Sequence, residues 1–87
     1  MKQFVYPIVL YFDDTTSCYT VAFHDLDIYT EGDTVEEAFL KATEFLEAYF
    51  DCIVEFNETP EEASKYLSVF EKHKKDLVLL TKITLNN

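Results

Sequence analysis

The sequence predicts one small α+β domain, with three strands, two helices and a last strand in the order β-β-β-α-α-β. Three observations predict it. Apolar residues alternate with a period of two along residues 3–12 and 17–24, they recur at helical spacing over 35–49, and they alternate again over 76–85. The chain has 87 residues, of which 48% are hydrophobic, including eight Phe and six Tyr. We therefore expect a single domain over residues 1–87 with enough apolar material for a core.

The first predicted strand, residues 3–12, is apolar on both faces. One face carries Phe4, Tyr6, Ile8, Leu10 and Phe12, and the other carries Val5, Pro7, Val9 and Tyr11. Both faces need cover, so a sheet with few helices leaves one face for a partner. Pro7 lacks an N–H, which favours an edge position or a bulge.

A polar turn, residues 13–17, and a second strand, residues 17–24, predict a hairpin. A short third strand follows over residues 27–31. Gly32, the only glycine, then lies between strand and helix, where a positive φ would explain it.

Thr34 and Glu37 form a predicted capping box at the start of the first helix. Asp33 and Glu36 offer the same pattern one residue earlier, so the sequence leaves two adjacent positions for the start of the helix. The helix would bury an apolar stripe made of Val35, Ala38, Phe39, Ala42, Phe45, Leu46 and Tyr49.

The second half of the chain predicts a helix and a strand. Residues 51–58 fit either a helix end or a short strand. A second capping box over residues 59–62 predicts a helix whose inner face carries Ala63, Tyr66, Leu67 and Phe70. The last strand, residues 76–85, must return to the sheet, where it can run parallel to the first. We expect both helices on one face of the sheet.

The charge balance limits the function classes. The formal net charge is −10, and all seven basic residues are lysines. Nucleic-acid binding needs positive charge and favours arginine, so direct binding of DNA or RNA is not expected. The one basic run, residues 72–75, is short. An acidic surface suits a basic partner, although acidity can also serve only to keep an aromatic-rich chain in solution.

No apolar run approaches the length of a membrane span, and no signal peptide is visible. Cys18 and Cys52 fit neither a disulfide framework nor a zinc site. We expect a cytoplasmic protein with reduced thiols.

Four acids surround the second and third strands: Asp25, Asp27, Glu31 and Asp33. Carboxylates on neighbouring strands could hold Mg²⁺ and support phosphodiester hydrolysis, but turn and capping roles are the plainer interpretation. His24 and His73 have no nucleophile at a recognisable spacing. We therefore expect no enzyme, no metal and no cofactor.

The run over residues 5–50 resembles the HicB-like antitoxin family. Three ordered motifs carry the resemblance: Tyr6-Pro7, then Tyr19-x-Val21-x-Phe23-x-Asp25-Leu26, then Gly32-Asp33-Thr34-x-Glu36-Glu37-Ala38. The resemblance implies a partial ribonuclease H-like fold. It also implies an antitoxin that binds and masks a small basic HicA-type toxin, a ribonuclease that cuts messenger RNA.

The sequence departs from the family pattern in three places. Residues 24–29, HDLDIY, replace the usual Pro-Asp-Leu-Pro-Gly-Cys, which puts the partner contact there in doubt. The first turn lacks the usual glycine. No C-terminal DNA-binding module is visible.

The partner contact is expected at Asp25, Asp27, Tyr29 and Glu31. Turn and cap roles are expected for Gly32, Asp33, Thr34 and Glu37. Two alternatives remain: a stand-alone dimeric regulatory or ligand-binding domain, and a metal-dependent nuclease of ribonuclease H-like ancestry. An open sheet edge at Pro7 or at the last strand could pair two chains into a homodimer.

Overall fold

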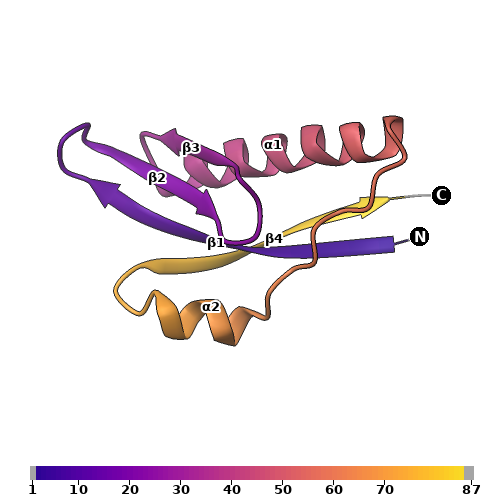
Figure 1. The fold of residues 1–87 in the computed structure, drawn as a ribbon. Coiled ribbons are helices and arrows are strands. Elements are labelled where there is room, and N and C mark those ends of the chain that lie inside the picture. Colours follow the sequence, from indigo (N-terminus) through magenta and orange to yellow (C-terminus); the bar gives the residue numbers. More distant parts are fainter. Residues whose placement is uncertain (1, 86–87) are drawn as a thin grey trace.

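A four-stranded antiparallel sheet forms the centre of the computed structural model, which describes residues 2–85 (Figure 1). The strands lie in the order β3-β2-β1-β4. Their bounds are β1 Lys2–Asp13, β2 Cys18–Phe23, β3 Tyr29–Gly32 and β4 Leu77–Leu85, and the helices are α1 Val35–Glu55 and α2 Tyr66–Lys72. The predicted α+β class and element order are confirmed.

The two helices lie on opposite faces of the sheet (Figure 1), so the expectation that both share one face is wrong. α1 packs on the face that carries Tyr6, Ile8, Leu10, Val21 and Phe23. α2 packs on the other face, where Val69 meets Val9 and Val78. Because β1 is apolar on both sides, each side recruits a helix.

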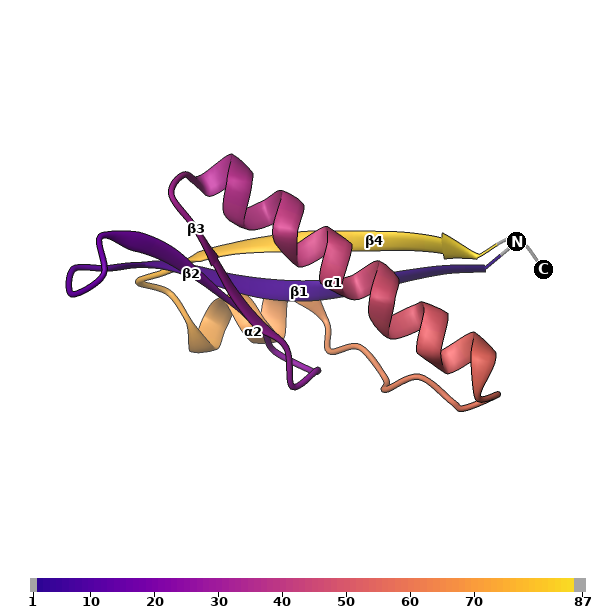
Figure 2. The ribbon, with the colours of Figure 1, turned by 90° about the horizontal axis from the view of Figure 1, so that it is seen from above.

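β4 pairs antiparallel with β1, from Lys2↔Leu85 to Leu10↔Leu77, so the parallel arrangement considered from sequence is wrong. The chain leaves α1 and passes to the other face, where α2 ends close to the end of β1 (Figures 1 and 2). β4 therefore starts beside the last residues of β1 and runs back along it.

Pro7 lies in the central strand β1, not at an edge or bulge as expected. Its carbonyl oxygen accepts a hydrogen bond from the N–H of His24 at 3.3 Å, just past the end of β2. The pairing of β1 with β2 ends at Ile8, next to Pro7. The N–H that Pro7 lacks would therefore point toward β2 where the paired region ends.

The segment of residues 56–65, which we call the connector, replaces the predicted start of the second helix. Glu61 is held on both sides: its N–H donates to the Tyr49 hydroxyl at 3.1 Å, and its carbonyl accepts from the Tyr6 hydroxyl at 2.6 Å. These bonds use the backbone of the second capping box, so α2 begins at Tyr66 instead.

The inner face of α2 also differs from the prediction. Val69 is its buried residue, whereas Leu67 is 71% exposed. The ambiguous residues 51–58 continue α1 as far as Glu55. Asn57 follows with a φ of 51°, a conformation that asparagine tolerates after a helix.

Candidate functional site

The sheet face opposite α1 is only partly covered. α2 has seven residues and packs on β1 and β4 through Val69. The β1-β2-β3 end of this face remains uncovered, and we call its residues the open patch: Tyr11, Thr20, Ala22, Tyr29 and Glu31.

Strand register places the open patch on one surface. Tyr11 is opposite Thr20, which is opposite Glu31, and the next row pairs Ala22 with Tyr29. Paired residues share a face because side chains alternate along each strand. Tyr11 is 42% exposed and Tyr29 is 67% exposed, so two aromatic rings face solvent here. A hollow of about 320 Å³ lies beside Tyr29, lined also by Thr20, Thr30 and Glu31.

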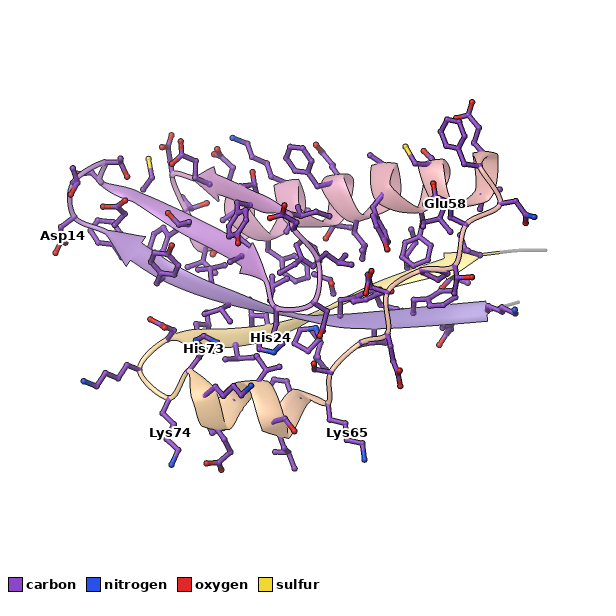
Figure 3. The ribbon with its side chains drawn as sticks, in the orientation of Figure 1. Asp14, His24, Glu58, Lys65, His73 and Lys74 are labelled. Atoms are coloured by element: carbon purple, nitrogen blue, oxygen red, sulfur yellow. The ribbon has the colours of Figure 1, made fainter. Side chains whose placement is uncertain are left out.

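Acidic side chains border the open patch. Glu31 is exposed within it, and Asp13 ends β1 on the same face. Asp14 lies at the tip of the β1-β2 turn (Figure 3). The Asp13 carboxylate accepts the N–H of Thr15 at 2.9 Å, which fixes that acid in the turn. The patch therefore combines exposed aromatic area with negative charge.

The structure separates the four residues expected to contact a partner. Tyr29 and Glu31 lie together in the open patch. Asp27 is exposed in the bend between β2 and β3. Asp25 instead accepts the N–H of Ser64 at 2.9 Å and its hydroxyl at 2.5 Å, so it anchors the connector.

The expected turn and cap residues run from the end of β3 into the first turn of α1. Thr34 is the N-cap of α1, and its hydroxyl accepts the N–H of Glu37 at 3.0 Å. The Glu37 carboxylate pairs with Lys41 at 3.2 Å. The Asp33 carboxylate accepts from the Cys18 thiol at 3.7 Å. Burial is the main cause that raises the pKa of Cys18, and the hydrogen bond to Asp33 raises it further.

The positive φ expected at Gly32 is wrong. A Cβ at this position would lie 2.5 Å from the backbone N of Ala38 and 2.9 Å from its Cα. Glycine is needed because β3 approaches the start of α1 too closely for any side chain.

A second hollow, of about 370 Å³, lies between the sheet and the end of α2. His24 and His73 meet at its wall, with ring centroids 5.9 Å apart and ring planes at 79° (Figure 3). Sequence reasoning missed this pair, because 49 positions of chain separate the two histidines and no spacing rule links them.

Within residues 2–85, no three side chains of the His, Cys, Asp or Glu type are placed to share a metal ion. The acids around β2 and β3 do not converge on one point: Asp25 binds Ser64, and Asp33 accepts from Cys18.

The pKa of Tyr6 is also shifted from its ordinary value. Burial, reinforced by Tyr49, raises the pKa of Tyr6 to about 12. Its neutral hydroxyl serves as a donor to Glu61.

Neither α1 nor α2, the helices of the described chain, has the length and apolar character needed to cross a bilayer.

A family model described as HicB_like antitoxin of bacterial toxin-antitoxin system matches residues 5–68. No curated protein matches the sequence. The N-terminal domain of Burkholderia pseudomallei antitoxin HicB is similar in structure, with a TM-score of 0.80 at 20% identity over 94% of this chain and 100% of that chain. A toxin-antitoxin complex from Streptococcus pneumoniae contains a similar chain, with a TM-score of 0.78 at 19% identity over 95% of this chain and 70% of that chain. The two likenesses show the fold.

Proposed function

The chain belongs to the HicB-like antitoxin family of bacterial toxin-antitoxin systems, and from this premise we propose that it binds and masks a small basic ribonuclease toxin of the HicA type, which cuts messenger RNA. A solved toxin-antitoxin complex with a similar chain supports a toxin as the partner. We propose that the protein acts by binding alone, without catalysis and without a cofactor.

The observation that carries this proposal is the open patch. Protein interfaces are enriched in tyrosine, because its ring supplies apolar area and its hydroxyl a polar contact. Tyr11 and Tyr29 offer both on a rigid sheet. Glu31 and Asp13 add negative charge, and the net charge of −10 favours a basic partner.

Such a surface would mask a toxin by occupying the surface that binds RNA, without a chemical reaction. Complementary charge speeds the encounter, and burial of the two tyrosine rings slows dissociation. A toxin must bind RNA through its own positive surface. An acidic partner on that surface excludes RNA because it occupies the space and because its negative charge repels the RNA phosphates.

We propose that this happens in the cytoplasm, a compartment that suits the free thiols of Cys18 and Cys52.

A stand-alone dimeric regulatory or ligand-binding domain is the second candidate, and the position of β4 favours it. β4 is an edge strand of nine residues, with one side unpaired within the described sheet. Such an edge can add a strand from a second copy. A homodimer of about twice 10.2 kDa in light scattering, together with no capture of a toxin, would favour this candidate.

The test is capture of the product of the neighbouring reading frame, at low and high salt, with its cleavage of messenger RNA measured in parallel. Salt-sensitive capture and loss of cleavage are expected. Glu31→Lys should weaken capture at least about tenfold.

Glu44→Lys is the matched control, because it makes the same change of net charge on exposed α1, away from the open patch. Equal loss in both variants would show that only total charge matters, and no capture by the unaltered chain would refute the antitoxin proposal.

A further inference from the structure

We propose that the hollow between the sheet and the end of α2 is a socket for one arginine side chain of a basic protein partner. This inference rests on the proposed function for the source of the arginine, and it adds a defined contact beside the open patch. We call this hollow the α2 pocket. Its lining includes Val9, Tyr11, Ala22, His24, His73 and Asp76.

The α2 pocket has an apolar floor. Val9 is buried in β1, and Ala22 is its partner in β2. Tyr11 is half exposed and belongs to both this pocket and the open patch. The pocket is therefore continuous with the surface proposed to bind the toxin, and its volume of about 370 Å³ lies near the lower end of the range for ligand sites. It suits one side chain rather than a peptide.

The wall of the α2 pocket is aromatic and carries one acid. His24 and His73 meet edge to face at the end of α2. Asp76 follows in the turn to β4, where its backbone N–H donates to the His73 carbonyl at 3.1 Å. Its partly buried carboxylate forms no ion pair with the residues that the structure describes.

An arginine fits this combination better than a lysine. The guanidinium is flat, so it can stack on a tyrosine or histidine ring while two of its N–H groups bind one carboxylate. Its apolar stem would lie on Val9 and Ala22. A lysine ammonium can pair with Asp76 but cannot stack in the same way.

This chain cannot fill the α2 pocket with an arginine of its own, because it has none. Lys74, in the turn after α2, points away from the sheet and pairs with Glu71 at 3.2 Å (Figure 3). A partner that matches a net charge of −10 is rich in basic residues, so it can supply the side chain.

The experiment titrates the ¹⁵N-labelled full chain with N-acetyl-arginine amide and, separately, with its uncharged citrulline analogue. A single side chain gives weak binding, on the order of millimolar. We expect saturable shifts at the amides of Ala22, His24, His73 and Asp76 with the arginine compound, at least about tenfold stronger than with citrulline.

Asp76→Asn should reduce the response to arginine to that of citrulline. The Asp76 carboxylate makes no hydrogen bond or ion pair with the residues that the structure describes, and thermal unfolding checks that the variant is intact. Glu47→Gln removes one exposed acid from α1, on the other side of the sheet, and should leave the response unchanged. In the toxin capture assay, Asp76→Asn should weaken affinity about tenfold while Glu47→Gln should not.

The two proposals fail in different ways. Shifts spread over the whole surface, or equal shifts with citrulline, would overturn the arginine socket even if the toxin is captured. Undiminished toxin binding by Asp76→Asn would also overturn it. Localised, Asp76-dependent shifts would support the socket even if the capture assay refutes this toxin as the partner.

Discussion

The two helices cover the two faces of the sheet to different extents. Under α1, four helix residues with at most 1% exposure, Ala38, Ala42, Leu46 and Phe50, close over the sheet. On the other face, one helix residue, Val69, covers Val9 and Val78, and the β3 end stays open. Most of the core therefore lies under α1, and the β3 end of the other face remains available for contact with another molecule.

A cavity under α1 should have the largest effect. Leu46→Ala removes a fully buried side chain and should lower the free energy of unfolding by about 2–5 kcal/mol. Leu67→Ala on α2 is the matched control, because that side chain is 71% exposed; it should change the same quantity by no more than about 0.5 kcal/mol. Denaturant unfolding measures both, and equal losses would contradict the burial of Leu46 under α1 and the exposure of Leu67 on α2.

Gly32→Ala should have the next largest effect on stability, because it adds a methyl group where β3 contacts the start of α1. The new Cβ would meet backbone atoms of Ala38, which cannot rotate away as a side chain could. We expect a loss of about 1–3 kcal/mol in the free energy of unfolding. A stabilised variant would show that the backbone of Ala38 does not exclude a Cβ at position 32.

Of the three substitutions, Tyr29→Ser should have the smallest effect on stability. Tyr29 is 67% exposed, so we expect a change within about 0.5 kcal/mol in the free energy of unfolding. Toxin capture should nevertheless weaken by about tenfold or more, since buried tyrosines dominate interface energies. Calorimetry of binding checks this, and a matched loss of stability would assign Tyr29 to the fold instead.

Local patterns predicted the elements that depend on neighbours in sequence. Alternation identified β1 and β2, and the Thr34 cap identified the start of α1. The features that depend on distant contacts were missed. The second capping box was overridden by hydroxyls of Tyr6 and Tyr49, which hold Glu61 in the connector.

Some residues of the candidate site could likewise be predicted from local patterns, and others depend on distant contacts. Tyr29 and Glu31 lie in one strand, so their shared face follows from the period of two. Asp25 could not be assigned from sequence, because Ser64, its partner, lies 39 positions further on. The His24 and His73 contact and the carboxylate of Asp76 require the path of the connector, which no local pattern encodes.

The pairing of β1 with β4 has a consequence for synthesis. β1 leaves the ribosome long before β4, its partner in the sheet, since Lys2 is opposite Leu85. Until residues 77–85 emerge, β1 has a free edge and Val9 lacks Val78 beside it. A nascent chain, or one cleaved before β4, is thus exposed to proteases at β1, because β4 is needed to pair the free edge of that strand.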